Sequence, residues 1–346
     1  MRQFDRPTDF GKVRHNARFQ RAARHPMHTA TPTPHPGVTA MIAQCGQPDV
    51  TLATARSTAR RYLATLSSTL VFALAASSAF IALAPHTACA QTIASDATPD
   101  EALDAAINGP QRTETFRTRD VYRHPRETLD FFGVKPNATI VEIAPGGGWY
   151  TEILAPYLHD HGKLYAELYE SRDPALAAEF VQDEQRFHKK LTDNPATFEH
   201  VTVGTLRAGK MTGVPPNSAD MVLTFRNIHN WIKDGQFDAN LRAFYTALKP
   251  GGVLGVEEHR ANPNITTEQV IKTGYVPESY VIAHALAAGF KFDAESNVNS
   301  NPRDTKDYPN GVWSLPPTLK GGDQDRARML AIGESDRMTL RFVKPQ

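Results

Sequence analysis

Hydrophobic and polar positions follow two different periods along residues 98–346, and together these periods predict an α/β fold. Short apolar or β-branched runs, which suit buried parallel strands, lie between longer segments with apolar residues three or four positions apart, which suit helices. Because strand-like and helix-like segments alternate, we expect one mostly parallel sheet with helices on both faces. The strands are predicted at 139–143, 163–168, 200–203, 219–225, 253–257, 291–298 and 339–343, and the helices at 99–108, 125–132, 150–158, 174–191, 237–248 and 277–288.

The last two predicted strands are separated by a long stretch rich in Pro, Gly and Asp, at 301–322. A loop of this length inside a compact domain is usually either functional or disordered. Its Tyr308, Val312, Trp313 and Leu315 are too apolar for a free linker. We therefore expect this segment to form a lid or wall of a binding site.

The first ninety residues have another pattern. Residues 1–55 contain Arg, His, Thr and Pro without hydrophobic periodicity, which predicts a disordered leader or a segment upstream of the true start. Residues 56–90 combine an Arg-rich flank, the uncharged run Leu63–Ala84 and an Ala-x-Ala signature at Ala88 and Ala90, as is typical of a cleaved signal peptide. An uncleaved N-terminal membrane anchor is the alternative, because the uncharged run is long enough to span a bilayer. This pattern predicts export of residues 91–346, to the periplasm.

The charge divides at the same boundary. The chain has a formal net charge of +1, which sums +7 for residues 1–90 and −6 for residues 91–346. An acidic domain argues against nucleic acid as a partner, since phosphate contacts need a basic surplus. Both cysteines, Cys45 and Cys89, precede residue 91, which excludes disulfides and thiolate metal sites from the domain. We expect one domain that binds a small molecule and makes no membrane contact after signal cleavage, while its oligomeric state stays open.

The glycine-rich segment VEIAPGGGWYT, at 141–151, joins a predicted strand to a predicted helix. Glycines there permit positive φ angles and close approach of a ligand, and the N–H groups of the helix face that ligand. Dinucleotide-binding folds use a similar turn, but their fingerprint would place a third glycine where Thr151 stands. Binding of a nicotinamide dinucleotide is therefore disfavoured and not excluded.

Together with three other segments, this turn resembles the class I S-adenosylmethionine (SAM)-dependent methyltransferases, and in particular a bacterial group of exported, uncharacterised members. The other segments are ADMVLTFRNIHNW at 219–231, LKPGGVLGVEEHR at 248–260 and the tail GESDRMTLRFVKP. The resemblance covers about residues 118–345. It implies a Rossmann-like, seven-stranded sheet with an antiparallel last strand, and SAM as the cofactor.

The resemblance also implies which residues bind SAM. They are the turn, an acid after the second strand for the ribose hydroxyls, and the residues that follow the fourth strand: Glu142, Ala144, Pro145, Gly146, Gly147, Gly148, Glu167 or Glu170, Arg226 and Asn227. Two positions depart from the family pattern. Ala144 replaces the usual first glycine, and the strict spacing for the ribose acid falls on Leu168, between the two glutamates.

Two histidines are candidates for the chemistry, because ligands of open α/β sheets bind beyond the carboxyl ends of the strands. His229 follows the fourth predicted strand and His259 the fifth. Either side chain suits a general base, if the acceptor carries a proton; a local hydrogen-bonding role is the plainer alternative. The neighbouring acids, Glu257 and Glu258, do not complete a usual metal-ligand spacing, so we expect no metal.

Three aromatic residues, Trp231, Tyr275 and Trp313, are expected to wall the substrate pocket, with core packing as the alternative. The first functional hypothesis is a SAM-dependent methyltransferase with an unidentified small-molecule acceptor. Because SAM is made in the cytoplasm, an exported, non-catalytic small-ligand-binding protein is the second hypothesis, and an NAD-dependent oxidoreductase is the third. The intact Gly146–Gly148 turn favours the first hypothesis, whereas Ala144 and the displaced ribose acid favour the second.

Overall fold

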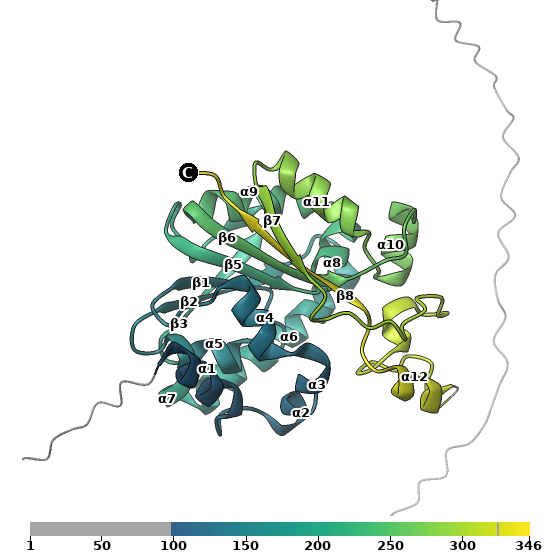
Figure 1. Ribbon diagram of the computed structural model, residues 1–346, viewed down its shortest axis with the longest axis horizontal. Helices are drawn as coiled ribbons and strands as arrows, with labels where there is room; N and C mark the ends of the chain where they lie inside the picture. The colour runs from purple at the N-terminus through teal and green to yellow at the C-terminus, as the bar shows by residue number, and fades with distance from the viewer. Residues whose placement is uncertain (1–97, 324) are drawn as a thin grey trace, which may run out of the picture. The chain divides into compact units, whose positions relative to one another are not determined.

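One sheet of eight strands forms the centre of the molecule, in the order β4-β3-β2-β1-β5-β6-β8-β7 (Figure 1). The computed structural model describes residues 98–323 and 325–346, so the predicted leader at 1–55 and the signal peptide at 56–90 lie outside the described residues. The strands are β1 Thr139–Ile143, β2 Lys163–Glu170, β3 Val201–Arg207, β4 Lys210–Met211, β5 Ala219–Phe225, β6 Leu248–His259, β7 Lys291–Ser296 and β8 Arg337–Val343.

The seven predicted strands are all present, and two of them have the predicted bounds. The largest difference is in β6, which begins at Leu248 because the KPGG segment continues the pairing with β5 across a register shift between Ala219 and Met221. The eighth strand, β4, is a two-residue antiparallel partner of β3 that the sequence analysis did not identify. A strand this short carries no alternation to detect.

The strand order reverses at β1: the chain adds β2 and β3 on one side of β1 and then returns to add β5 and β6 on the other. Strands β2 and β3 lie on one side of β1 and strands β5 and β6 on the other, all parallel. Strand β8 runs antiparallel to both of its neighbours, β6 and β7, which confirms the predicted antiparallel last strand. The topological switch point, where open α/β sheets bind ligands, therefore lies between the ends of β1 and β5.

Helices cover both faces of this sheet, as predicted (Figure 1). One core contains Ile140 of β1 with residues of α1 Pro99–Asn108, α4 Pro125–Phe132 and α5 Thr151–Leu158. The other contains Val141 and Ile143 of β1 with residues of α8 Ile228–Lys233, α9 Phe237–Ala247 and α11 Glu278–Ala287. Adjacent strand residues thus serve opposite cores, because side chains alternate across a sheet.

The sequence analysis missed the shortest helices. These have four to seven residues, too few to show a helical period: α2 Glu114–Arg117, α3 Asp120–Arg123, α7 Pro195–Phe198, α8, α10 Thr267–Thr273, the 3₁₀ helix η1 Gly311–Ser314 and α12 Arg326–Ile332. Several of them border the cavity described below. Among the described residues, no helix combines the length and the apolar composition that crossing a membrane requires.

The longest helix, α6 Pro174–Asp193, is held to the sheet by few side chains. Only Leu176 and Phe187 of its twenty residues are buried. Phe187 packs against Ala166 and Leu168 of β2, and its ring lies 3.2 Å from the position that a Cβ on Gly148 would take. Through Phe187, α6 is thus fastened over the glycine-rich turn.

We expect Phe187→Ala to lower the free energy of unfolding by about 3–5 kcal/mol, because it empties a fully buried aromatic site. Val181→Ala is the matched control on the same helix, since Val181 is exposed and its truncation should change stability by less than about 0.5 kcal/mol. Urea unfolding of both variants measures the difference. Equal losses in the two variants would show that α6 is not fastened through Phe187.

Candidate functional site

A large cavity of about 1330 Å³ lies at the carboxyl ends of β1, β5 and β6. The glycine-rich turn after β1, the segment Phe225–Asn227 after β5 and His259 at the end of β6 all line it. Side chains of α3, α6 and α8 and of the 301–322 segment complete its wall. The cavity thus occupies the topological switch point of the sheet.

The glycine-rich turn has three residues with left-handed backbone. Gly146 has φ +58° and Gly148 has φ +81°, conformations that glycine adopts without steric cost. Ala144 has φ +47°, so the departure from the family glycine is accommodated at the cost of about 1–2 kcal/mol of backbone strain. The N–H of Ala144 donates to the carbonyl oxygen of Glu167 at 2.9 Å, which ties the turn to β2. Ala144, Pro145, Gly146 and Gly147 line the cavity.

Glu142 lies beneath this turn and does not line the cavity. Its carboxylate is buried and accepts a hydrogen bond from Thr151 Oγ1 at 2.6 Å, which joins the end of β1 to the start of α5. Burial raises the pKa of Glu142 to about 7, although the bonds from Thr151 act in the opposite direction. The expected SAM ligand is therefore a support of the turn, because its side chain points into the core.

Neither candidate for the ribose acid faces the cavity. The Glu167 carboxylate is buried and accepts hydrogen bonds from the N–H groups of Gly213, at 2.9 Å, and Thr212, at 3.3 Å. Glu170 is exposed and lies 3.3 Å from Arg207 Nε. The expected ribose contact is thus corrected for both, because the turn after β4 folds over Glu167 and the edge of the sheet directs Glu170 outward.

A carboxylate that the sequence analysis did not identify lies at the turn instead. Asp183 of α6 lines the cavity, and its Oδ2 is 3.9 Å from the position that a Cβ on Gly146 would take. Its helix was predicted, but no sequence signal distinguished this acid from the other charged residues of α6. Its place over Gly146 depends on how α6 packs across β2.

Arg226 and Asn227, the two residues after β5, both line the cavity. Arg226 has left-handed backbone, with φ +61°, and its Nη1 lies 2.7 Å from Glu257 Oε1. Asn227 Nδ2 donates to the carbonyl oxygen of Ile143 at 3.0 Å. Asn227 therefore joins the ends of β1 and β5 across the switch point.

The two candidate bases lie side by side in the cavity wall, with ring centres 5.4 Å apart. His229 Nδ1 is 3.1 Å from Glu258 Oε1; since a carboxylate only accepts, Nδ1 carries the proton and Nε2 of the neutral ring is free to accept one. His259 Nδ1 is 2.6 Å from Ser335 Oγ. Burial, and then the neighbouring His229 and Arg226 side chains, hold the pKa of His259 well below its ordinary value, so this ring is neutral at neutral pH.

Two groups of described residues bring possible metal ligands within 4.8 Å of one another. The first group consists of His229, Glu258 and His259, and both of its histidines line the cavity. Its Glu258 already accepts hydrogen bonds from the N–H groups of Ile228, at 2.5 Å, and His259, at 2.8 Å, and from the His229 ring. Its two oxygens are thus engaged in holding His229, and we assign no metal to this group.

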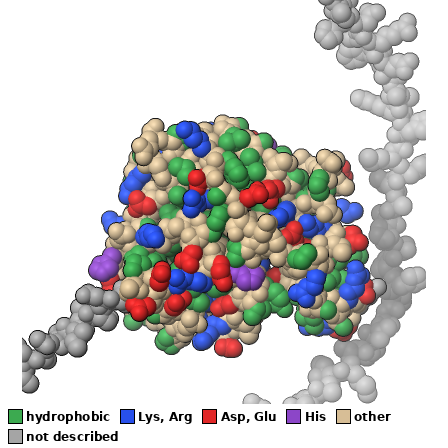
Figure 2. Space-filling view, viewed as in Figure 1, with side chains coloured by type: hydrophobic (Ala, Val, Ile, Leu, Met, Phe, Trp, Pro, Cys, Tyr) green, Lys and Arg blue, Asp and Glu red, His purple; other side chains and the backbone are tan. Residues whose placement is uncertain are grey.

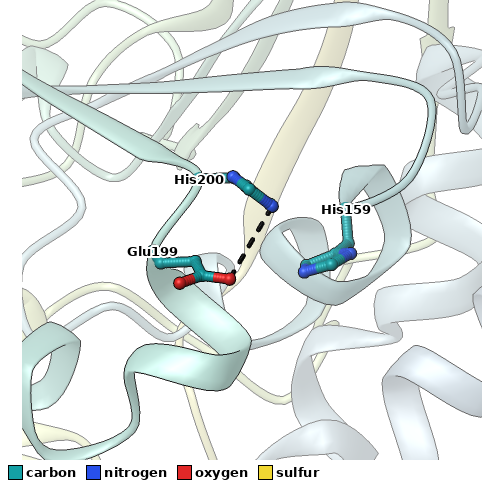
Figure 3. Close-up of side chains that lie close together, drawn as sticks. All are labelled: His159, Glu199 and His200. Atoms are coloured by element: carbon teal, nitrogen blue, oxygen red, sulfur yellow. Dashed lines mark ion pairs between the residues drawn. The ribbon is translucent and has the colours of Figure 1, made fainter.

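The second group lies outside the cavity wall, at the end of α5 and the start of β3 (Figure 3). Its members are His159, Glu199 and His200, and the dashed line marks the 3.9 Å pair of Glu199 with His200. Both members of this pair are exposed. We assign this group no part in the chemistry of the cavity.

Of the three aromatic residues expected around the substrate, only Trp313 lines the cavity, where its ring centre is 6.0 Å from that of His229. Pro316, Pro317 and Thr318 line it too, so the 301–322 segment supplies a wall. Trp231 is fully buried against Phe244, and Tyr275 donates to Asp304 at 2.9 Å outside the cavity lining. The expectation for Trp231 and Tyr275 is corrected to core packing.

Many charged or polar residues of the cavity wall were not among the sequence candidates for the site, among them Arg119, Arg123, Glu334 and Ser335. The only sequence signal at the arginines is their spacing of four residues, which places them on one face of a helix. On the face that Figure 2 shows, Lys and Arg side chains are interspersed with Asp and Glu.

Replacement of Glu142 by Gln is expected to change how stability depends on pH. Folding raises the pKa of this carboxyl from 4.5 to about 7, so between these values the folded state keeps a proton that the unfolded state has lost. The free energy of unfolding of the native protein therefore falls as pH rises through this window, by at most about 1.4 kcal/mol per pH unit. Glu142→Gln removes this contribution, so its stability relative to the native protein should rise with pH. Urea unfolding of both proteins at several pH values between 4.5 and 7 measures this difference in stability. If the stability of the two proteins changed with pH in parallel, the raised pKa of Glu142 would be contradicted.

Comparisons with known proteins give structural similarity only. No protein-family model and no curated protein matches the chain. A SAM-dependent methyltransferase from Aquifex aeolicus is 16% identical, with 71% of this chain and 98% of that chain covered and a TM-score of 0.43. The [4+2]-cyclase SpnF is 16% identical over 69% of this chain and 86% of that chain, with a TM-score of 0.44. Phosphoethanolamine N-methyltransferase 2 of Haemonchus contortus, solved with SAM, is 17% identical over 71% and 60%, with a TM-score of 0.43.

The fold can be assigned from the strand order of this chain itself. Parallel strands on both sides of β1, together with the antiparallel β8 between β6 and β7, agree with the sheet that the resemblance implies. The described residues therefore have a Rossmann-like α/β fold with a mostly parallel sheet and an antiparallel last strand.

Proposed function

We propose that this protein is a SAM-dependent methyltransferase that acts on a small-molecule acceptor in the cavity at the switch point. One observation carries the proposal. The glycine-rich turn after β1, the Arg226–Asn227 segment after β5 and the two histidines open into the same cavity. This combination places a nucleotide-type cradle beside candidate bases in the crevice where α/β sheets bind ligands.

The turn fits the amino-acid part of SAM. Gly146 and Gly147 leave their backbone open to the cavity, and a side chain at Gly146 would extend toward Asp183. In this proposal the turn holds the cofactor's amino-acid end and Asp183 binds the ribose hydroxyls, in place of Glu167 and Glu170. The cavity exceeds the usual volume of a single small-molecule site, which leaves room for an acceptor. When bound, SAM supplies an electrophilic methyl group.

His229 is suited to remove a proton from the acceptor. Its Nδ1–H is held by Glu258, so Nε2 is the basic nitrogen, and the carboxylate stabilises the positive charge that the ring gains. His259, which is neutral and held by Ser335, is the second candidate. Trp313 closes the wall beside these rings and limits the access of water.

Calorimetric titration of the purified protein with SAM, S-adenosylhomocysteine and NAD tests the cofactor assignment. We expect saturable binding of both SAM compounds, no binding of NAD, and loss of binding in Gly146→Val because the side chain enters the cradle. Gly133→Val is the matched control: Gly133 has φ +82° and open space around it, at the end of α4 and outside the cavity wall. A protein that folds and binds neither SAM compound at millimolar concentration would favour the non-catalytic alternative, and binding of NAD alone would favour the oxidoreductase.

The base is tested by turnover, once an acceptor has been found by screening for release of S-adenosylhomocysteine. We expect His229→Ala to lower kcat by about 10²–10⁴-fold, the usual contribution of a general base, with SAM affinity retained. His200→Ala, an exposed histidine outside the cavity wall, is the control. Unchanged turnover in both His229→Ala and His259→Ala would remove the histidines from the mechanism.

A further inference from the structure

A group of ion pairs adjoins the cavity and reaches its wall through Arg119, Arg123, Arg226 and Glu334, and in this group positive charges outnumber negative ones. We call it the arginine cluster; it consists of Arg119, Arg123, Arg226 and Arg337 with Glu257 and Glu334. Glu334 lies 2.6 Å from Arg119 Nε, 3.4 Å from Arg123 Nε and 2.9 Å from Arg337 Nη1. Glu257 lies 2.7 Å from Arg226 Nη1 and 3.2 Å from Arg337 Nε. Four guanidinium groups thus share two carboxylates.

Burial makes this imbalance costly. The side chains of Arg123 and Arg337 are 4% and 1% exposed, and Glu257 is not exposed at all. Burial, followed by repulsion from Arg226, lowers the pKa of Arg123 well below its ordinary value. Glu258 does not correct the imbalance, because it is the neighbour of Glu257 in β6, points to the opposite face of the sheet, and holds His229. A buried charge without a partner is costly, and an anionic ligand would compensate the excess in this cluster.

The cluster also presents donors to the cavity. Arg119, Arg123 and Arg226 line it, and the hydrogen bonds that Arg119 and Arg123 make to described residues use only their Nε atoms. Each guanidinium has five N–H groups, so the terminal nitrogens of these two arginines remain available. Arginine forks of this kind match the paired oxygens of carboxylates and phosphates.

An oxyanion could reach this cluster from the acceptor or from the carboxylate of SAM. SAM carries a sulfonium, an ammonium and one carboxylate, so as a whole it adds positive charge to a cavity that already has an excess. An anionic acceptor would instead offset both the positive charge of SAM and the positive excess of the cavity. Arg119, Arg123 and Arg226 line the same cavity as His229 and His259, so an acceptor held by the arginines can extend toward the candidate bases.

We propose that the arginine cluster binds an anionic group, a carboxylate or a phosphate, of the methyl acceptor. This inference rests on the proposed function for its acceptor, but the anion site itself can be tested without turnover. It narrows the substrate to acidic small molecules, with the anion on Arg119, Arg123 and Arg226 and the methylated atom near His229 and His259.

The test is titration of the full-length protein with inorganic phosphate and with acetate, each in the absence and presence of saturating S-adenosylhomocysteine. We expect saturable binding of at least one anion, raised thermal stability in its presence, and affinity that S-adenosylhomocysteine leaves unchanged within about twofold. Which of the two probes binds distinguishes a phosphate from a carboxylate.

Arg119→Gln and Arg123→Gln are expected to weaken anion binding by about tenfold or more, since each removes charge-assisted hydrogen bonds. Without the anion these variants should unfold at the same or a higher temperature, because each relieves part of the charge excess; a purely structural role would lower it. Arg126→Gln is the matched control, because Arg126 pairs with Asp100, Asp104 and Asp130 outside the cavity wall.

Three results separate this inference from the proposed function. A protein that binds S-adenosylhomocysteine and neither anion would overturn the inference and leave the proposed function standing. Competition between S-adenosylhomocysteine and the anion would overturn it as well, because the cluster would then serve the cofactor's carboxylate. Anion binding lost in both arginine variants, with no binding of S-adenosylhomocysteine, would support the anion site and remove methyl transfer.

Discussion

The buried carboxylate of Glu257 joins the parts of the chain on which the cavity depends. It contacts Arg226 after β5, Arg337 at the start of β8 and the hydroxyl of Tyr150, 3.2 Å away, beside α5. Burial opposes the ionisation of Glu257, but the two arginines outweigh it and lower its pKa, so the carboxylate stays charged. A buried carboxylate that lost these partners would be strongly destabilising. The ends of β5, β6 and β8 are therefore joined by these ion pairs in addition to the sheet ladder.

That alignment explains why strain and chemistry occur together at the switch point. Ala144 and Arg226 follow β1 and β5, respectively, and both have left-handed backbone although neither is glycine. Such conformations persist only where the surroundings enforce them, and they concentrate at functional sites. Here the enforcing contacts are the bond from Ala144 N–H to Glu167 and the ion pair of Arg226 with Glu257. The resulting turns direct backbone and guanidinium groups into the cavity.

Prediction from the sequence succeeded where a period extends over enough residues. The strand Ala219–Phe225 and the helix Pro99–Asn108 have the predicted bounds, because the apolar run of the strand and the helical spacing of the helix each extend over several residues. Helix α8 and the 3₁₀ helix η1 were missed, since one or two turns carry no measurable period. Glu167 shows the corresponding limit for side chains. Its strand was predicted, but its carboxylate accepts a hydrogen bond from Gly213, in the turn after β4, and β4 has only two residues and therefore no sequence pattern.

By itself the sequence determined the α/β class, the glycine-rich turn and the position of His229 and His259 at strand ends, whereas the antiparallel direction of the last strand was expected only from the family resemblance. The features that the sequence determined follow from local periodicity and from chain order, which a linear pattern contains. Only the tertiary structure decided which side chains face the cavity. The side chains of Trp231 and Tyr275 pack in the core, whereas Arg119 pairs with Glu334, which is 215 residues away in the sequence. Such contacts depend on packing between distant elements and on the cost of burying charge, and neither is encoded in the spacing of neighbouring residues.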